Sequence, residues 1–336
     1  MKNQTIDRFS PLKLKNGKIL LNRVIVPPMA SETADQEGFV TENTLAHYTG
    51  LTESKAGFIV VEYSFVHISG RSEEKQLGVS SDAHLDGLKA LSYRIHQQGA
   101  LAGIQLTHSG GKTESRFTDS LLYSPSGIIV PVKDKILEKP SEMNLEDINN
   151  WKKWFVEAAH RASLANFDLI ELHAAHGYGL NQWLSPITNK RCDKYGGSVL
   201  KNIRLILEII ESIKSKLPYL LISVRIPGQD FLEGGLSTDD CILIAKLLQN
   251  AGIDIINVSS GIGGWRRPGT RNGEGYLVEE ASRIQKNVSI PVIGVGGIET
   301  GAYIDDILKD NKISLAAVGR AILKDPKGWG HAYLMN

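Results

Sequence analysis

The sequence predicts an α/β protein of the (β/α)8 barrel class, and three observations lead to that prediction. Short apolar runs bounded by polar or glycine-rich turns recur along the 336 residues. Amphipathic helical stretches separate most of these runs, as at 151–166 and 202–216. The runs are continuously apolar, which is typical of parallel strands covered on both faces. Eight such units within about 300 residues match the barrel pattern.

We expect the strands at eight places: 24–26, 58–61, 101–105, 168–172, 220–224, 254–258, 291–295 and 315–318. Ahead of the first strand, residues 12–21 alternate around an Asn16-Gly17 turn, which is a strong hairpin signal. We expect this hairpin to plug the bottom of the barrel. The connection 109–150, after the third strand, is longer than one helix requires. It predicts a lid or excursion within a single domain that spans 1–336.

Composition argues against several classes of partner. The chain has 38 basic and 37 acidic residues, so its net charge of +1 indicates neither nucleic acid nor a membrane surface as the main partner. The N-terminus lacks the apolar region of a signal peptide, and no uncharged apolar stretch is long enough to span a membrane, so we expect a cytoplasmic protein. Cys192 and Cys241 form no CxxC pair, which argues against a cysteine-held cluster. A homo-oligomer is compatible with these data.

The strongest functional signal is the segment His-Ala-Ala-His-Gly-Tyr at 173–178, directly after the expected buried strand. His173 and His176 could share a metal ion, but no HExxH pattern accompanies them and a third ligand would have to come from elsewhere. We therefore expect no metal, and interpret both as neutral imidazoles that donate to a substrate oxygen. Tyr178, with an ordinary pKa near 10, is a candidate proton donor. Schiff-base chemistry is disfavoured because the lysine nearest to a strand end, Lys112, lies in a loop.

The ends of other strands suggest a bound cofactor. Active sites of such barrels collect at the carboxyl ends of the strands, where strands seven and eight lead into Gly296-Gly297 and Gly319-Arg320. Backbone N–H groups and a guanidinium there can hold a phosphate, although tight turns alone could also explain the glycines. Arg225 and Gln105 suit a flat heterocycle with donors and acceptors at its edge, unless neighbouring core groups satisfy them. Flavin mononucleotide (FMN) fits this outline.

One further glycine-rich segment invites a different interpretation. Ser260-Gly-Ile-Gly-Gly264 resembles a dinucleotide fingerprint, but no helix opens after it, so we reject a Rossmann site. Arg266, Arg267 and Arg271 follow on the same loop and could meet phosphates of a nicotinamide cofactor or an acyl-CoA. We favour a solvated loop.

At this point the chain resembles the old yellow enzyme family of FMN-dependent NAD(P)H:flavin oxidoreductases, as a single-domain member of bacterial type. The resemblance runs from about Pro11 to Pro326. It is carried by these motifs: Asn22-Arg-Val-Ile-Val-Pro-Pro-Met29, Gly103-Ile-Gln-Leu-Thr-His-Ser-Gly110, Glu171-Leu-His-Ala-Ala-His-Gly-Tyr178, Leu184-Ser-Pro186, Asn189-Lys-Arg-Cys-Asp-Lys-Tyr-Gly-Gly-Ser198, Gly319-Arg320 and Asp325-Pro326.

The resemblance implies a ping-pong reaction in which NADPH or NADH reduces tightly bound FMN and an α,β-unsaturated carbonyl compound is then reduced at its C=C bond. It implies that His173 and His176 bind the substrate carbonyl and that Tyr178 protonates the neighbouring carbon. The cofactor-binding residues that it implies are Pro27, Pro28, Met29, Ala30, Tyr63, Gln105, Arg225, Gly296, Gly297, Gly319 and Arg320.

Departures from the family pattern limit what can be carried over. Ala30 stands where one bacterial subgroup has a flavin-tuning cysteine, and Glu32 stands near where that group often has a substrate-contacting tyrosine. Two alternatives therefore stay open at this stage. One keeps the cofactor but oxidises an amine or dehydrogenates a ring, and the other is a flavin-binding protein without turnover.

Overall fold

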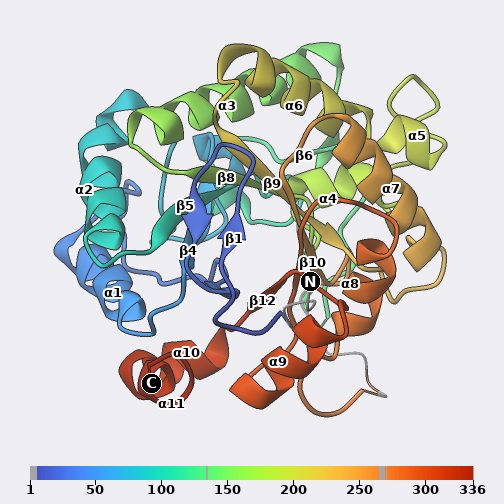
Figure 1. The fold of residues 1–336 in the computed structure, drawn as a ribbon. Helices are drawn as coiled ribbons and strands as arrows, with labels where there is room; N and C mark the ends of the chain where they lie inside the picture. The colour runs from blue at the N-terminus through green and yellow to red at the C-terminus, as the bar shows by residue number, and fades with distance from the viewer. Residues whose placement is uncertain (1–5, 134, 265–268, 270, 336) are drawn as a thin grey trace.

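The computed structural model describes residues 6–133, 135–264, 269 and 271–335, and its central feature is a closed barrel of eight parallel strands (Figure 1). The strands are β3 (Val24–Val26), β4 (Phe58–Phe65), β5 (Leu101–Thr107), β8 (Leu169–His173), β9 (Leu221–Pro227), β10 (Ile255–Ser259), β11 (Val292–Gly294) and β12 (Leu315–Ala317). They neighbour one another in chain order, and β12 closes the ring against β3. This confirms the predicted fold class, and each strand overlaps the run expected for it.

Helices surround the barrel, as Figure 1 shows. The longer ones are α1 (Glu42–Thr52), α2 (Leu85–His96), α3 (Leu145–Leu164), α6 (Arg204–Lys216), α7 (Thr238–Asn250), α8 (Val278–Gln285), α9 (Gly301–Lys309) and α11 (Pro326–Tyr333). Shorter turns of helix are α4 (Gly179–Leu184), α5 (Val199–Asn202) and α10 (Arg320–Lys324), with 3₁₀ turns η1 (Ile68–Gly70), η2 (Asp82–His84) and η3 (Ser115–Phe117).

Helix α3 begins six residues before the predicted start, at Leu145 instead of Trp151. The reason is a capping box, in which the side chain of Asn144 accepts from the N–H of Asp147 and the Asp147 carboxylate accepts from the N–H of Asn144. Buried Ile148 stands three residues before Trp151, so the apolar face of the helix extends into this first turn, and the polar cap at Asn144 sets where the helix begins.

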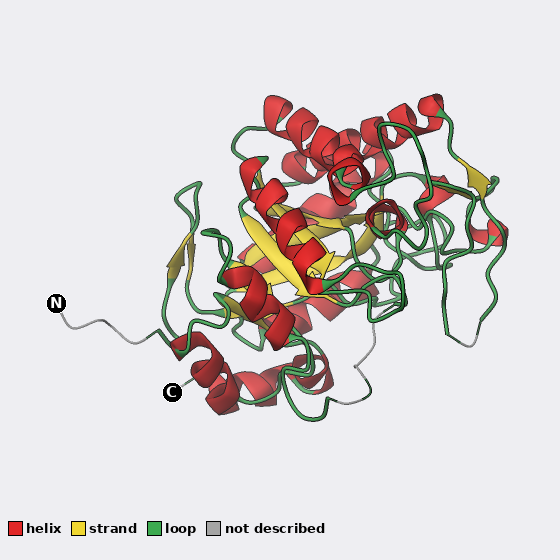
Figure 2. Cartoon of the chain, turned by 90° about the vertical axis from the view of Figure 1, so that its right-hand side faces the viewer, coloured by secondary structure: helices red, strands yellow, loops and turns green. Residues whose placement is uncertain are grey.

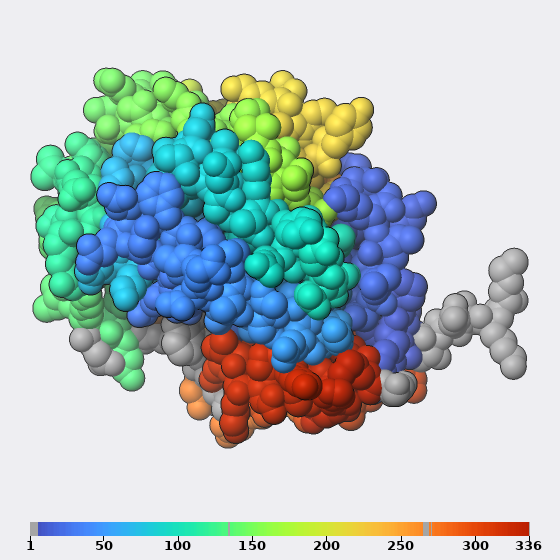
Figure 3. All heavy atoms as spheres, turned by 90° about the vertical axis from the view of Figure 1, so that its left-hand side faces the viewer, coloured from blue at the N-terminus to red at the C-terminus, as the bar shows by residue number. Residues whose placement is uncertain are grey.

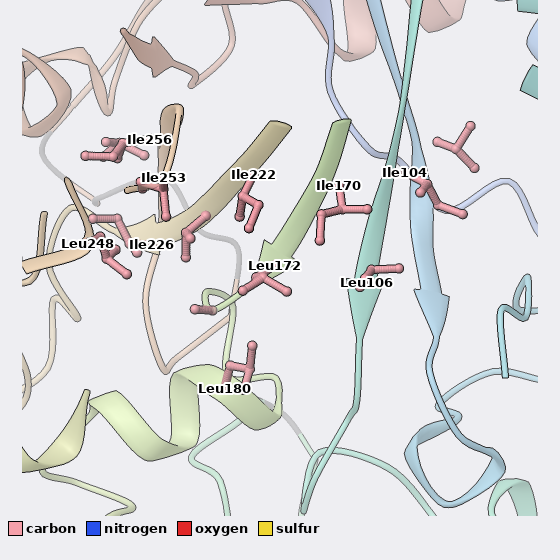
Figure 4. Packing of buried hydrophobic residues seen from close by; sticks show 14 of the residues in the cluster. Ile104, Leu106, Ile170, Leu172, Leu180, Ile222, Ile226, Leu248, Ile253 and Ile256 are labelled. Atoms are coloured by element: carbon pink, nitrogen blue, oxygen red, sulfur yellow. The ribbon is translucent and has the colours of Figure 1, made fainter. Parts of the chain in front are cut away.

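The main core lies between the barrel and its helices. Figure 4 shows Ile104, Ile170, Ile222 and Ile256, which leave adjacent strands on this outer side. Because side chains alternate along a strand, their sequence neighbours point into the barrel. The same alternation that builds this core therefore selects which residues reach the barrel interior.

The hairpin of β1 (Leu12–Lys13) and β2 (Ile19–Leu20) closes one end of the barrel. Leu14 and Leu20 belong to the interior apolar cluster, together with residues at the starts of the strands such as Phe58 and Leu169. In Figure 2 the hairpin stands at the left end of the molecule, away from the loops gathered at the right. It thus plugs the amino-terminal end of the barrel, as predicted.

The long connection after β5 forms a small structure of its own. It contains β6 (Tyr123–Ser124) and β7 (Ser141–Glu142), which pair in parallel. Val130 and Leu137 within it pack against Ile262 of the loop after β10. The excursion therefore lies against the loops at the carboxyl ends of the strands.

The two ends of the described chain meet on one side of the barrel. Figure 3 shows the red C-terminal residues lying directly against the blue N-terminal third. The guanidinium of Arg8 donates to the carbonyl of Tyr333 at 2.7 Å and also pairs with Asp305. Among the described residues, no helix is long and apolar enough to cross a membrane.

Candidate active site

The two-residue period of the strands places a layer of polar side chains inside the barrel, above the apolar plug. On β8 the inward positions after Leu169 are Glu171 and His173, while Ile170 and Leu172 face the helices. The register pairs Glu171 with Ser223 of β9 and His173 with Arg225. The barrel interior therefore changes from apolar to polar toward the carboxyl ends of its strands.

Glu171 organises this layer, a role that was not predicted from the sequence. It is fully buried and accepts hydrogen bonds from Gln105 (2.8 Å), Ser223 (3.0 Å) and Asn257 (2.9 Å). Because a carboxylate can only accept, its bond with Gln105 fixes that amide with its NH₂ toward Glu171 and leaves the amide oxygen for another partner. A charged residue inside an otherwise apolar run was the signal that could have revealed it.

A cavity of about 490 Å³ opens above the polar layer, at the carboxyl ends of the strands. A cavity of this size suits a small molecule or cofactor. All fourteen site residues named from the sequence line it: Pro27, Pro28, Met29, Ala30, Tyr63, Gln105, His173, His176, Tyr178, Arg225, Gly296, Gly297, Gly319 and Arg320. Further lining residues that the sequence analysis did not assign include Glu73, Ser259 and Tyr276.

The loop after β3 is held against the cavity by a buried carboxylate. Glu62 accepts from the backbone N–H of Ser31 at 3.2 Å and from the hydroxyl of the same serine, and the Tyr48 hydroxyl donates to it at 3.3 Å. Burial raises the pKa of Glu62. The register of β4 shifts between Val61 and Tyr63, so a bulge turns the Tyr63 side chain into the cavity.

The two histidines come from a strand end and from a strained turn. His173 is the last residue of β8, whereas His176 has a positive φ of 60°, an uncommon conformation for a residue with a side chain. The turn brings the two rings to 5.1 Å between centroids. His176 Nε2 lies 2.6 Å from the Ser259 hydroxyl, while buried His173 Nδ1 has no hydrogen-bond partner among the described residues. The described chain therefore leaves one nitrogen of His173 without a hydrogen bond.

Tyr178 caps the N-terminus of α4 and stands beside His173. The two ring centroids are 4.8 Å apart, and the ring of Tyr63 lies 5.4 Å from that of Tyr178. Burial, followed by the negative charge of Glu73, raises the pKa of Tyr178 to about 12. The phenol therefore keeps its proton throughout the neutral range.

Burial has the opposite effect on the imidazoles, because their charged form is the protonated one. It lowers the pKa of both His173 and His176 well below 6.5, and the nearby charges of Arg225 and Lys112 add to the decrease. Both rings are consequently neutral near pH 7. A neutral imidazole beside a protonated phenol can donate hydrogen bonds and a proton to an oxygen-bearing ligand.

Arg225 is a cation buried inside the barrel, where a charge without an ion-pair partner is unfavourable. It is only 7% exposed, and no ion pair joins it to a carboxylate of the described chain. One guanidinium nitrogen donates to Ser259 at 3.3 Å, but its buried Nε lacks a partner among the described residues. Burial lowers the pKa of Arg225, since a buried cation is unfavourable without an electron-rich neighbour.

The opposite side of the cavity is shaped by glycines. Gly296 and Gly297 have positive φ values of 121° and 68°, and a Cβ on Gly296 would lie 2.8 Å from the backbone nitrogen of Leu277. Gly319 precedes α10, and the exposed guanidinium of Arg320 lies 3.5 Å from where a Cβ of Gly297 would stand. The backbone of these glycines and the guanidinium of Arg320 thus lie close together on this side of the cavity.

The surrounding loops differ in what they contribute. Glu32 and Glu73 line the rim of the cavity, whereas no described residue of 109–150 does, so the role of that excursion as a lid stays a prediction. Arg271 is not solvated as expected, because it donates to buried Glu280 at 2.6 and 2.8 Å. Arg266 and Arg267 lie outside the described residues.

Comparison with known proteins agrees with this architecture. The chain matches the model of the NADH:flavin oxidoreductase / NADH oxidase family over residues 7–329. It is 37% identical to an NADPH dehydrogenase of Bacillus licheniformis over 320 residues, which cover 95% of this chain and 91% of the relative. An NADPH dehydrogenase of Bacillus subtilis is 34% identical, with the same coverage of 95% and 91%.

Solved structures give the same fold. An old yellow enzyme homologue from Zymomonas mobilis superposes with a TM-score of 0.83 at 23% identity, covering 95% of this chain and 90% of the other. A histamine dehydrogenase from Rhizobium sp. 4-9 gives a TM-score of 0.84 at 26% identity, but 96% of this chain covers only 48% of that longer one. The chain therefore belongs to the NADH:flavin oxidoreductase / NADH oxidase family, that of the old yellow enzymes, and is an oxidoreductase.

Proposed function

We propose that this protein binds FMN and uses NAD(P)H to reduce the activated C=C bond of α,β-unsaturated carbonyl compounds. The observation that carries the proposal is buried Arg225. This residue lines the cavity, and its Nε has no hydrogen-bond partner within the described chain. A heterocycle that gathers negative charge when reduced would offset the cost of burying this cation. Family membership supports the same cofactor.

The residues around the cavity fit FMN. The amide of Gln105, oriented by Glu171, would bind the pyrimidine edge, and Arg225 would stabilise negative charge on the reduced ring. Pro27, Pro28, Met29, Ala30 and Tyr63 would frame the ring, while Gly296, Gly297, Gly319 and Arg320 would hold the phosphate. The chemistry that FMN would supply when bound is hydride transfer to the substrate, with NAD(P)H as the source of the hydride.

The chain's own part in the reaction falls to three side chains. His173 and His176 would donate hydrogen bonds to the substrate carbonyl, which draws electrons from the C=C bond and stabilises negative charge on that oxygen. Tyr178, whose pKa is raised to about 12, would hold a proton for the carbon next to the carbonyl. The hydride and the proton would thus reach adjacent carbons.

An anaerobic absorbance titration tests the proposal. The purified protein should be yellow, bleach when NADPH is added, and recover its colour when a cyclic enone follows. NADPH is tried before NADH because the similar Bacillus proteins are NADPH dehydrogenases. A colourless protein that also takes up no added FMN would exclude the flavin, and a bleached protein that ignores every enone would exclude this substrate class.

A second candidate function, amine oxidation, is favoured by the two carboxylates on the rim. Neither Glu32 nor Glu73 forms an ion pair or a side-chain hydrogen bond within the described chain, so both could attract an ammonium group. The fold is also shared with a histamine dehydrogenase. Adding histamine in place of NADPH separates the two functions, since only an amine-oxidising enzyme would bleach with the amine.

The depressed pKa values of the histidines lead to a pH prediction. Because burial lowers the pKa of His173 and His176 well below 6.5, both stay neutral from that pH upward, and Tyr178, with its pKa raised to about 12, stays protonated throughout the neutral and mildly alkaline range. The oxidative half-reaction should therefore be flat from about pH 6.5 to 9. Stopped-flow rates across this range provide the check; a decline with a midpoint inside it would mean that one of these groups titrates there.

The same shifts affect stability in the acidic range. As the pH falls, the two imidazoles of the unfolded chain take up protons near pH 6.5, whereas those of the folded protein take them up only at lower pH. Protons therefore favour the unfolded chain, and the free energy of unfolding should fall as the pH drops below 6.5. Urea unfolding at about pH 5.5 and 7.5 measures the difference, and replacing both histidines should reduce it.

A further inference from the structure

Lys112, in the loop after β5, places a positive charge against the candidate proton donor. Its ammonium nitrogen lies 4.2 Å from the centroid of the Tyr178 ring. The same nitrogen donates a hydrogen bond of 2.6 Å to the carbonyl oxygen of His176. The side chain is half-buried, and its positive charge contributes to lowering the pKa of both His173 and His176. The lysine is therefore held over the phenol ring rather than free in solvent.

Proton transfer from Tyr178 leaves a negative charge on its oxygen, which burial and a nearby carboxylate disfavour. When the phenol gives up its proton, the electron pair of the O–H bond stays on the oxygen. Burial and the carboxylate of Glu73 both disfavour this phenolate, as the raised pKa of Tyr178 shows. A cation a few ångströms away has the opposite effect, because it is attracted more strongly to the phenolate than to the neutral ring.

We propose that Lys112 is a positioning residue that stabilises the negative charge left on Tyr178 during proton delivery; this inference rests on the proposed function. In this step, hydride that NAD(P)H supplies by way of the flavin would add to the β-carbon of the enone, and the C=C electron pair would give an enolate. The α-carbon of the enolate then forms a bond to the Tyr178 proton, and the O–H electron pair remains on Tyr178. Water later returns a proton to the phenolate.

The contact with His176 offers a competing explanation, in which Lys112 only holds the turn that carries the histidine. The two explanations differ in their dependence on the phenol. If Lys112 acts through the charge on Tyr178, its removal should matter only while Tyr178 can donate a proton. If it acts through the shape of the turn, its removal should cost the same with or without the Tyr178 hydroxyl.

A double-mutant cycle distinguishes these explanations. Lys112→Met removes the charge at similar length, and we expect it to slow enone reduction by about 10-fold or more, since an opposite charge at this distance changes a pKa by roughly one unit or more. In a Tyr178→Phe background the same substitution should change the rate less than about 2-fold. Lys112→Arg, which keeps a cation, should restore most of the rate.

Two further readouts complete the test. Flavin reduction by NADPH, and reduction of a quinone, which is protonated on oxygen, should be unchanged in Lys112→Met. Equal losses in both backgrounds, or no rescue by Lys112→Arg, would overturn the inference. Failure of the unmodified protein to reduce any enone would instead contradict the proposed function. If Lys112→Met does not retain FMN, Lys112→Gln takes its place in the same cycle.

Discussion

Tyr178→Phe is expected to slow alkene reduction by about 10²- to 10⁴-fold, the usual contribution of a general acid, while reduction of the flavin by NADPH changes little. The physical reason is that the variant keeps the ring and its packing against His173 and loses only the proton. With a pKa of about 12, that proton is present at any pH at which the enzyme would be assayed. Stopped-flow measurement of the two half-reactions separates the two effects.

Tyr63→Phe is the matched control for this experiment. Tyr63 is a second buried phenol in the same cavity, with its ring centroid 5.4 Å from that of Tyr178. Burial raises its pKa further above the ordinary value, so it is a poorer proton donor, and its loss should cost only a few-fold. A large loss in Tyr63→Phe with a small one in Tyr178→Phe would assign the proton to Tyr63.

Replacing both His173 and His176 by alanine is expected to produce the second large effect. We expect ligands with a carbonyl or phenol oxygen to bind about 10- to 100-fold more weakly, because two hydrogen bonds of ordinary strength are lost. The rate should fall by a further factor of about 10², since these donors also stabilise the negative charge that develops on the carbonyl oxygen. Absorbance titration with a phenol measures binding apart from turnover.

Ser259→Ala provides the graded comparison. It removes the 2.6 Å partner of His176, together with the 3.3 Å acceptor of Arg225, and leaves both imidazole rings in place, so we expect a several-fold loss instead of the full effect. FMN content and circular dichroism would show whether each variant folds. If a phenol bound the double variant as tightly as the unmodified protein, the histidines would not be the carbonyl-binding groups.

Much of the fold follows from local patterns in the chain. The eight apolar runs lie where the strands are because a strand covered on both faces must be apolar along its length, and this property is visible in a few consecutive residues. The segment 173–178 was recognisable for the same reason, since its three candidate side chains lie within six residues. These signals do not depend on which strands become neighbours.

Other parts of the site were hidden because their partners are distant in the sequence. Glu171 is held by Gln105, Ser223 and Asn257 from three different strands, so its role depends on closure of the barrel. The continuously apolar interpretation of β8 also passed over it, although the polar residues Glu171 and His173 stand two positions apart in the sequence.

The sequence by itself determined the barrel class, the strand order along the chain and the residues that stand at each strand end, because the two-residue period of a strand and the end of an apolar run are local properties. Only the tertiary structure decided that Lys112 lies over Tyr178, that Ser259 meets His176 and that Arg225 is buried without a partner for its Nε within the described chain. The physical reason is that these contacts join side chains from separate loops and strands, so they exist only after the barrel has closed and its loops have packed.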